Sequence, residues 1–517
     1  MNHLLTVADA VAAHARLTPD KLAVRDSRRS LSYAQWQARA TALANGLLGI
    51  GLTKGDRVAL LAYNCVEWME IYAALAAAGL VAVPINFRLT PAEIAYIVQH
   101  SEARAVIAQD ELADQVDAVR QQLAVAADAY IAFGADLPIG WRSFEQLIAS
   151  ADTHPPQVEV RPGDMSALMY TSGTTGKPKG AIRSHEGSAL IALATALEMR
   201  FSRDDTALLV MPLCHANSLY FSQTFVHLGA TCVIDDRRNF DPEAMLATLS
   251  QQKVTFTSLV PTHYIMMLGL PEAVKAKYDV SRVEKLMISS APARRETKLA
   301  ILAHFRNGRL YELYGSTETG WVTLLRPDEQ IDKLGSVGRE WAGSGPIRLL
   351  DPQGQEVPDG EVGELYSRTP YVFDGYWKNP EKTAEAFCGA WCSVGDMARR
   401  DAQGYIHLVD RKSNMIISGG ENVYPSEVEA VLGAHPSVKD VAVVGVPHDN
   451  WGEAVQAIVV LHAGAEATEA ELVAWCRGRI AGYKRPQAVR FIADAEMPRT
   501  ATGKILHRAL RGRIASE

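Results

Sequence analysis

Residues 170–180 read Tyr-Thr-Ser-Gly-Thr-Thr-Gly-Lys-Pro-Lys-Gly, and the rest of the chain is interpreted outward from them. The nine residues 172–180 hold three hydroxyl side chains, three glycines and two lysines. Glycine lets backbone N–H groups approach an anion closely. Hydroxyl and ammonium groups add donors and charge, so the segment indicates a phosphate-binding loop. The apolar run 165–169 predicts a strand, and we expect the loop to leave a sheet edge. A Gly/Thr-rich surface linker is the alternative.

The loop does not follow the Walker A pattern. That pattern requires four residues between its first glycine and Gly-Lys, and then Ser or Thr after the lysine. Here two residues separate Gly173 from Gly176, and Pro178 follows Lys177. A phosphate loop of another kind is therefore expected.

Four further motifs follow the loop in sequence order. They are Tyr-Gly-Ser-Thr-Glu at 314–318, Val-Gly-Asp at 394–396, Asp-Arg-Lys-Ser-Asn-Met-Ile-Ile-Ser-Gly-Gly-Glu-Asn at 410–422, and Pro-Arg-Thr-Ala-Thr-Gly-Lys at 498–504. With these motifs the chain resembles, over residues 31–511, the adenylate-forming superfamily. That superfamily includes acyl-CoA and aryl-CoA ligases, firefly luciferase and peptide-synthetase adenylation domains. The resemblance is strongest to 4-coumarate-type and fatty-acyl CoA ligases.

Composition narrows the class of protein. A chain of 517 residues is too long for one compact core, so two or more domains are expected. Apolar residues make up 48% and charged residues 21%, which is typical of a soluble globular enzyme. The net charge of −7 argues against a nucleic-acid partner.

The cysteines and the apolar runs predict a cytoplasmic protein. Six cysteines are scattered without metal-ligand spacing, and we interpret them as reduced thiols. The start of the chain shows no signal peptide. The most apolar run, 71–85, is interrupted by Gly79 and Pro84 and is too short to span a bilayer.

Alternating strands and helices predict a largely parallel sheet flanked by helices. Expected strands lie at 58–62, 81–84 and 105–108, and the same rhythm resumes after the loop with strands at 206–211, 231–234, 254–259 and 285–289. Turn signals after residue 335 indicate a β-rich subdomain. We predict an α/β N-terminal adenylate-forming domain at 1–409, a hinge at 410–413 and a mobile α+β C-terminal domain at 414–517.

The resemblance implies a reaction in two halves. ATP and a carboxylate give acyl-adenylate and pyrophosphate, and the coenzyme A thiol then displaces AMP. It assigns the phosphate clamp to the loop, with Glu318 as the Mg²⁺ ligand, because a carboxylate beside a triphosphate requires a bridging cation. Thr317 would contact the α-phosphate, and Tyr314 would stack on adenine, although a core tyrosine is the alternative. The other implied ATP- and AMP-binding residues are Thr171, Ser172, Gly173, Thr174, Thr175, Gly176, Lys179, Ser290, Ala291, Pro292, Glu312, Gly315 and Ser316.

The C-terminal motifs complete the implied nucleotide site. Asp396 would accept hydrogen bonds from both ribose hydroxyls, since a carboxylate is acceptor-only. Arg411 would add a donor to the ribose or hold Asp396 in place. Lys504 would bridge the carboxylate and the α-phosphate, where charge develops. A solvated lysine is the alternative for Lys504.

The remaining assignments concern the acid, coenzyme A and the hinge. His215 would line the carboxylate end of the acyl pocket as a gate rather than a general base, because a carboxylate is already ionised. Ser413 would be the hinge residue. The other implied acyl-pocket residues are Asn217, Ser218, Phe221 and Val322, and the implied coenzyme A residues are Gly419, Gly420 and Glu421.

We therefore predict an ATP- and Mg²⁺-dependent acid–CoA ligase that acts on a medium- or long-chain fatty acid. An aryl or hydroxycinnamate CoA ligase is the first alternative, and a non-catalytic nucleotide-binding protein is the second. The expected partners are a small carboxylic acid and coenzyme A, with no nucleic acid and no transmembrane segment. The sequence leaves the oligomeric state open, a homodimer included.

Overall fold

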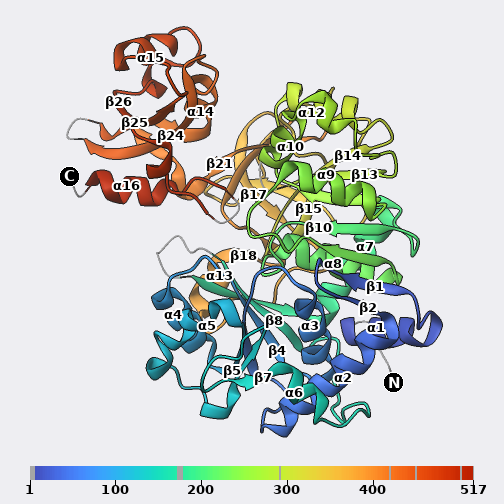
Figure 1. The fold of residues 1–517 in the computed structure, drawn as a ribbon. Helices are drawn as coiled ribbons and strands as arrows, with labels where there is room; N and C mark the ends of the chain where they lie inside the picture. Colours follow the sequence, from blue (N-terminus) through green and yellow to red (C-terminus); the bar gives the residue numbers. More distant parts are fainter. Residues whose placement is uncertain are drawn as a thin grey trace. The chain divides into compact units, whose positions relative to one another are not determined.

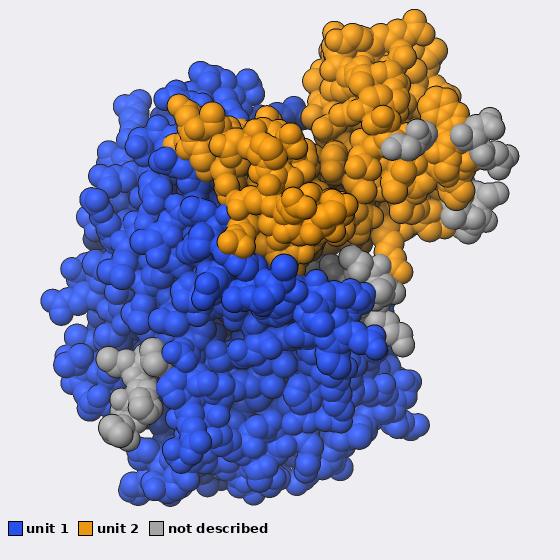
Figure 2. Space-filling model, turned by 180° about the vertical axis from the view of Figure 1, so that it is seen from behind, with its two compact units in different colours: residues 1–347, 367–392 blue, residues 348–366, 393–517 orange. Residues whose placement is uncertain are grey.

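The computed structural model describes residues 6–171, 178–289, 293–418, 421–448, 451–500 and 503–515. The chain forms two compact units, shown as a ribbon in Figure 1 and in separate colours in Figure 2. Unit 1 comprises residues 1–347 and 367–392, and unit 2 comprises residues 348–366 and 393–517. Unit 2 thus takes a short segment from the middle of the chain together with the C-terminal part.

The first sheet of unit 1 is parallel except at one edge. Its strand order is β7-β6-β5-β3-β4-β8-β9, and only β9 runs antiparallel to its neighbour. The strands are β3 (Arg57–Leu61), β4 (Val81–Ile85), β5 (Ala103–Gln109), β6 (Tyr130–Phe133), β7 (Arg142–Ser143), β8 (Met165–Thr171) and β9 (Lys179–Ser184).

The second sheet of unit 1 is also mainly parallel. Its order is β15-β14-β13-β12-β10-β11-β1-β2, with the antiparallel strands β15 and β2 at its two edges. The strands are β1 (Leu22–Arg25), β2 (Ser30–Ser32), β10 (Thr206–Leu209), β11 (Thr231–Ile234), β12 (Phe256–Leu259), β13 (Lys285–Ile288), β14 (Arg309–Ser316) and β15 (Gly320–Leu325).

Helices cover both faces of both sheets, so unit 1 has five layers. One core lies between the sheets and includes the inner helices, while two further cores lie beneath the outer helices. The inner helices are α1 (Val7–Leu17), α2 (Tyr33–Gly49), α3 (Val66–Ala78), α6 (Phe144–Ala149), α7 (His185–Met199) and α8 (Ala216–Leu228). The outer helices are α4 (Pro91–Ser101) and α5 (Asp110–Asp117) on the first sheet, and α9 (Pro242–Gln251), α10 (Pro261–Leu268), α11 (Glu272–Lys275) and α12 (Arg295–His304) by the second.

Local sequence fixes the ends of these helices. Thr90 and Glu93 form a capping box at the start of α4, and Pro91 occupies its first turn. Gly79 and Gly229 end α3 and α8 in the left-handed conformation, which glycine adopts without steric cost. These caps give the helices their length and direct the chain back into the sheets.

A short segment of unit 1 follows the second sheet. It contains α13 (Pro380–Ala386), β18 (Phe387–Cys388) and β19 (Trp391–Cys392). Phe373 and Tyr376, which precede α13, pack in a small core with Ala181 of β9. This packing brings residues 371–376 next to the strand that follows the phosphate loop.

Unit 2 begins with a β-rich part and continues into an α+β part. The β-rich part pairs β17 antiparallel with β20, and β20 antiparallel with β21. In the α+β part, β24 and β25 form a long antiparallel hairpin, with β26 parallel to β25. The elements are β16 (Ile347–Leu350), β17 (Val362–Ser367), β20 (Asp396–Arg400), β21 (Ile406–Arg411), β22 (Ile416–Ser418), β23 (Glu421–Val423), α14 (Pro425–Leu432), β24 (Val438–His448), β25 (Gly452–Leu461), α15 (Glu469–Trp475), β26 (Ala488–Phe491) and α16 (His507–Ala515).

The structure confirms the predicted fold class and most of the predicted elements. The expected strand 231–234 coincides with β11, and the expected strand 81–84 with all but the last residue of β4. The division into compact units falls at different positions from the predicted domains, and the hinge at 410–413 stays a prediction. Within the described residues, no helix is both long and apolar enough to cross a bilayer.

Candidate active site

The phosphate loop connects two strands at the edge of the first sheet. Thr171 ends β8, Lys179 begins β9, and the two residues are register partners across the antiparallel pair. The loop itself, residues 172–177, lies outside the described residues, and so do the predicted contacts of Ser172, Gly173, Thr174, Thr175 and Gly176. The sheet-edge position predicted for the loop is therefore confirmed at both of its ends.

The Tyr-Gly-Ser-Thr-Glu motif forms the turn between β14 and β15. A Cβ atom on Gly315 would lie 2.1 Å from the carbonyl oxygen of Gly320, so only glycine allows this close approach of the two strands. Within the turn, the hydroxyl of Ser316 accepts a hydrogen bond from the backbone N–H of Thr319 at 3.0 Å. The turn is compact, and it carries Thr317 and Glu318.

One carboxylate oxygen of Glu318 accepts two hydroxyl hydrogen bonds. Thr171 Oγ1 donates to Glu318 Oε1 at 3.0 Å, and the phenol of Tyr376 donates to the same atom at 2.9 Å. Lys179 Nζ lies 4.0 Å from the centre of the Tyr376 ring. The structure thus brings together Thr171, Lys179 and Glu318, three of the residues implied by the resemblance.

This arrangement fits a magnesium ion that is shared with a nucleotide. Among the described residues, no hydrogen bond reaches Glu318 Oε2, and no group of three His, Cys, Asp or Glu side chains could form a metal site. Mg²⁺ is usually held by one or two carboxylates together with substrate phosphates and water, not by an all-protein cage. A single oriented carboxylate next to the phosphate loop meets that requirement.

A second group of predicted residues lies in unit 2. Asp396 is buried, and Arg411 Nε lies 2.5 Å from its Oδ1 across the β20–β21 pair. Arg411 also donates to the carbonyl oxygen of Val394 at 3.2 Å. Arg411 thus makes the ion pair with Asp396 that one of its two predicted roles requires, and both roles stay predictions.

Lys504 lies in the same unit, within a turn whose backbone is closed by a hydrogen bond from Thr500 N to Lys504 O at 2.7 Å. The residue keeps contact with solvent, yet its pKa is lowered, first because surrounding groups remove part of its hydration and second because of the charge of Arg411. The charges of Asp396 and Asp410 act in the opposite direction. A cation placed among these groups can neutralise charge at the α-phosphate, which is the role predicted for it.

His215 precedes α8, and Asn217 lies in its first turn. Burial, with a smaller contribution from the charge of Arg88, lowers the pKa of His215 to about 4. The imidazole is therefore neutral at physiological pH, as expected of a gate or positioning group. Asn217 Nδ2 donates to Ser289 Oγ at 3.0 Å.

The other predicted acyl-pocket residues are buried. Phe221 packs against Phe256 and Trp321, with ring centres 4.7 and 5.6 Å apart. Ser218 and Val322 are 2% and 0% exposed. These three residues therefore act as packing around the site unless the pocket opens, and their contact with the acid stays a prediction.

Several predicted residues stand apart from the Glu318 cluster or cannot be placed. Glu312 is buried and makes an ion pair with Lys298, with Nζ and Oε2 2.5 Å apart, so its side chain is engaged away from the cluster. Tyr314 is half-buried at the end of β14, and Glu421 is exposed in β23. Ser290, Ala291, Pro292, Gly419 and Gly420 lie outside the described residues.

Sequence reasoning missed two residues of this site, Arg183 and Tyr376. Arg183 is 1% exposed, and its guanidinium donates to the carbonyl oxygens of Thr317 and Glu318, both at 3.3 Å. Strand alternation was the available signal, because it places Ala181 and Arg183 on the same buried side of β9. An arginine at an inward position of a strand calls for a specific partner, whereas nothing local distinguishes Tyr376 from a core tyrosine.

The five-layer fold, the strand ends of the loop at a sheet edge and the Glu318 carboxylate in contact with Thr171 fit an enzyme that handles nucleoside triphosphates. Comparison with known proteins gives the family. The model of the AMP-binding enzyme family matches residues 11–377, and that of the AMP-binding enzyme C-terminal domain matches residues 427–504. The chain belongs to this adenylate-forming family and is an AMP-forming acyl-CoA synthetase that uses ATP, Mg²⁺ and coenzyme A.

Its relatives act on different acids. The chain is 38% identical to a feruloyl-CoA synthase of Amycolatopsis, over 97% of both chains. It is 36% identical to a long-chain-fatty-acid–CoA ligase of Mycobacterium tuberculosis, over 93% of this chain and 92% of that one. The solved structure of ATP-bound MatB from Rhodopseudomonas palustris is 32% identical and covers 100% of this chain and 99% of its own, with a TM-score of 0.86. These relatives support activation of a carboxylic acid through an acyl-adenylate and leave the acid open.

Proposed function

We propose that the acid is a hydroxylated aromatic carboxylic acid of the hydroxycinnamate type. The observation that carries this proposal is a buried polar group beside His215. Asn217 Oδ1 is buried and has no hydrogen-bond partner among the described residues, while the amide nitrogen of the same side chain donates to Ser289. Ser289 Oγ in turn lies 3.3 Å from Ser258 Oγ, and both serines are buried.

Asn217, Ser289 and Ser258 form a polar row, and this row would favour one class of acid over another. An alkyl chain packed against Asn217 would leave the amide oxygen desolvated and unpaired, at a cost of about 1–3 kcal/mol. A hydroxyl group on the acid can donate to that oxygen and remove the cost. Phe221 lies one helical turn after Asn217 in α8 and packs with Phe256 and Trp321 in a buried aromatic cluster. An aromatic ring of the acid would extend this cluster once the pocket opens.

The reaction follows from the family and from the residues described above. The carboxylate attacks the α-phosphorus of ATP, pyrophosphate leaves, and the coenzyme A thiol then attacks the acyl carbonyl and releases AMP. Mg²⁺ bound at Glu318 would neutralise phosphate charge. Lys504 would stabilise the charge that develops between the carboxylate and the α-phosphate, and Asp396, held by Arg411, would bind the ribose.

A fatty acid is the second candidate. The similarity to the mycobacterial long-chain-fatty-acid–CoA ligase favours it, and the sequence led us to expect it. If the acid is aliphatic, each additional buried methylene should contribute about 0.8 kcal/mol, close to fourfold in kcat/KM. That series would end where the pocket ends.

We propose that the enzyme acts in the cytoplasm. The six cysteines are all free, which agrees with a reducing compartment.

The test is the substitution Asn217→Leu, assayed with 4-hydroxycinnamate and with cinnamate, which differ only in the hydroxyl group. We expect kcat/KM for 4-hydroxycinnamate to fall about tenfold or more, because one buried hydrogen bond is lost. The value for cinnamate should stay the same or rise. The matched control is Gln223→Leu, which removes an amide six residues further along α8, on a different side of the helix, and should not change the ratio of the two acids. An unchanged ratio in Asn217→Leu would contradict the proposal.

A further inference from the structure

Arg183 is a buried cation whose partners are backbone carbonyls. Its Nη1 donates to the carbonyl oxygens of Thr317 and Glu318, both at 3.3 Å, and its Nη2 donates to that of Tyr371 at 2.7 Å. The side chain belongs to β9, the strand that the phosphate loop enters. One guanidinium thus joins three separate segments of unit 1.

The same carbonyls and their neighbours receive further support from residues 369–373. Phe373 N donates to Glu318 O at 2.7 Å, and Thr369 Oγ1 donates to Thr319 O at 2.7 Å. The phenol of Tyr371 donates to the carbonyl oxygen of Trp321 at 2.9 Å. Residues 369–373 therefore fix the backbone of the turn through its carbonyl oxygens, and Arg183 ties this framework to β9.

A buried guanidinium is costly for the fold. Removing a charge from water is unfavourable by several kcal/mol, and apolar side chains of similar volume often serve stability as well or better. What an apolar side chain cannot do is donate to two consecutive carbonyls and to a third from another segment. The presence of arginine at this position therefore points to control of backbone geometry.

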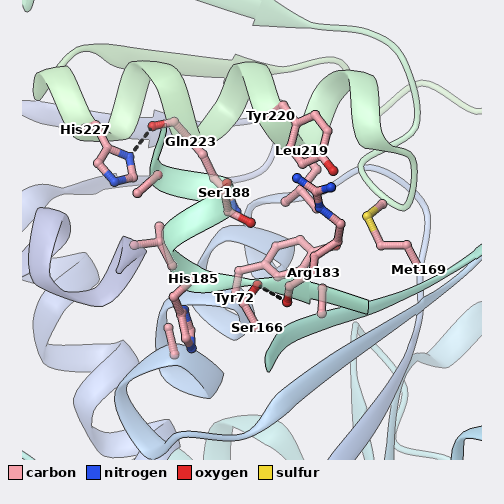
Figure 3. Close-up of a pocket in the computed structure, with 14 residues that line it drawn as sticks. Tyr72, Ser166, Met169, Arg183, His185, Ser188, Leu219, Tyr220, Gln223 and His227 are labelled. Atoms are coloured by element: carbon pink, nitrogen blue, oxygen red, sulfur yellow. Dashed lines mark hydrogen bonds between the residues drawn. The ribbon is translucent and has the colours of Figure 1, made fainter. Parts of the chain in front are cut away.

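The guanidinium borders an internal cavity of about 20 Å³, shown in Figure 3. Arg183 lies beneath Tyr220 of α8, with Cζ 5.4 Å from the centre of the ring. Arg183, His185 and Gln223 line the cavity, and their buried atoms Arg183 Nε, His185 Nε2 and Gln223 Oε1 have no hydrogen-bond partner within the part of the chain that the structure describes. Shortening the Arg183 side chain would enlarge this polar cavity by the volume of the lost guanidinium. A free guanidinium ion could then occupy the space and restore function.

We propose that Arg183 is a positioning residue for acid activation. It fixes the Thr317–Glu318 backbone, so that the Glu318 carboxylate remains beside Thr171 and Tyr376 in the orientation that binds Mg²⁺ with ATP. The inference rests on the proposed role of Glu318 as the Mg²⁺ ligand. It assigns to Arg183 no contact with the substrate.

The test compares Arg183→Met, Arg183→Ala and Arg183→Lys with the matched control Arg57→Met. Arg57 is also largely buried and donates to three backbone carbonyls, those of Ser101, Gly55 and Glu102, but in β3. Pyrophosphate release is measured as a function of Mg²⁺ concentration. Binding is measured separately, as the rise in unfolding temperature produced by ATP with Mg²⁺ relative to ATP with EDTA.

We expect Arg183→Met to lose about 10- to 100-fold in adenylation rate, as is typical when support of a metal ligand is removed. It should need more Mg²⁺, lose most of the Mg²⁺-dependent rise in unfolding temperature, and keep the KM for the acid. Millimolar guanidinium, far below denaturing concentrations, should partly restore Arg183→Ala, and ammonium should not. Arg57→Met should show a normal Mg²⁺ response.

A normal Mg²⁺ response in folded Arg183→Met would overturn the inference, and so would a loss of activity that guanidinium does not restore in Arg183→Ala. If Arg183→Met does not fold, the Mg²⁺ response of Arg183→Lys tests the inference instead. A lysine ammonium group cannot donate to the same three carbonyl oxygens in the planar geometry of the guanidinium, so this variant should also need more Mg²⁺. Glu318→Gln is assayed in parallel. A normal Mg²⁺ response in Glu318→Gln would contradict the assigned role of Glu318. A normal response in Arg183→Met, together with a defective one in Glu318→Gln, would contradict only the positioning role of Arg183.

Discussion

At the scale of single residues, the site depends on how each charged group is held. Glu318 Oε1 accepts from Thr171 and Tyr376, and Asp396 is held by Arg411 across a strand pair. Both carboxylates are buried. If they bind the nucleotide as predicted, orientation by these neighbours keeps the reorganisation small, which is how preorganised polar groups lower a barrier.

Lys504 gives the prediction at this scale. Replacing Lys504 with Ala should slow adenylate formation by about two to three decades, on the order of removing one preorganised donor. Thioester formation from preformed acyl-adenylate should continue, because in that half-reaction the bond between the carboxylate and the α-phosphate is already made. The two halves are measured separately, by pyrophosphate release and by mass spectrometry of the CoA thioester. Equal loss of both halves would show that Lys504 is structural.

At the scale of elements, turns and short helices position the predicted site residues and the predicted hinge. The Tyr-Gly-Ser-Thr-Glu turn depends on the contact between Gly315 and Gly320, and residues 412–414 form a single 3-10 turn directly after Arg411. Asp410 accepts hydrogen bonds from Asn414 Nδ2 at 3.1 Å and from Ser426 N at 2.9 Å. The segment predicted as the hinge is thus anchored on both sides, while Ser413 itself is exposed.

Proline at position 413 tests the hinge. Proline fixes φ near −65°, a value that suits a 3-10 turn, so Ser413→Pro should hold the backbone in one of the two orientations needed in the cycle. We expect one half-reaction to be lost and the other to stay close to normal, with the circular dichroism spectrum unchanged. Ser413→Ala is the control and should support both halves. If Ser413→Pro also supports both, the pivot lies elsewhere, with Lys412 as the next candidate.

The pair formed by His507 of α16 and Glu429 of α14 predicts a dependence of stability on pH. Burial alone would lower the pKa of His507, but the hydrogen bond to Glu429, 2.6 Å long, and the charge of that carboxylate outweigh burial and raise it above 6.5. A raised pKa in the folded state means that the contribution to stability is complete below 6.5 and is lost as pH rises through the higher value.

Hydrogen-exchange protection of α14 and α16 measures this contribution. The difference between the wild type and His507→Gln should be largest in mildly acid solution and should shrink as pH rises past the folded-state pKa of His507. The variant supplies the control for all other titrating groups. A difference that does not change with pH would mean that His507 acts by packing and not by charge.

The elements show what the sequence could and could not predict. Strand β11 and helix α3 follow from their apolar runs and glycine ends, because local pattern and burial agree there. The Glu318 cluster follows only in part: the motifs identify Thr171, Lys179 and Glu318, but the motifs do not include Tyr376 and Arg183. Alternation along β9 could have marked Arg183 as an inward residue, but it could not give its partners. Those partners, and the position of Tyr376, depend on strand pairing and on the packing of residues 371–376 on β9, which are long-range contacts without a local signature.

At the scale of the whole molecule, the predicted site residues are distributed over both units. Unit 1 carries the phosphate loop, Glu318 and the polar row at Asn217, whereas unit 2 carries Asp396, Arg411 and Lys504. An enzyme of this family completes two different reactions on one acyl group, so the distribution of its catalytic groups over two units is expected. In enzymes that change conformation between two such reactions, the conformational change often sets the overall rate.

We propose that this acid–CoA ligase joins a hydroxylated aromatic acid to coenzyme A through an acyl-adenylate. The most direct measurement is a competition in one vessel, with ATP, Mg²⁺, coenzyme A, and equal concentrations of 4-hydroxycinnamate, cinnamate and a series of straight-chain fatty acids. Mass spectrometry of the CoA thioesters then gives the ratio of kcat/KM values. We predict that 4-hydroxycinnamoyl-CoA forms fastest and that AMP and pyrophosphate accumulate with it. Dominant fatty-acyl-CoA products would contradict the assigned acid, and the absence of any CoA thioester with these acids would contradict the claim as a whole.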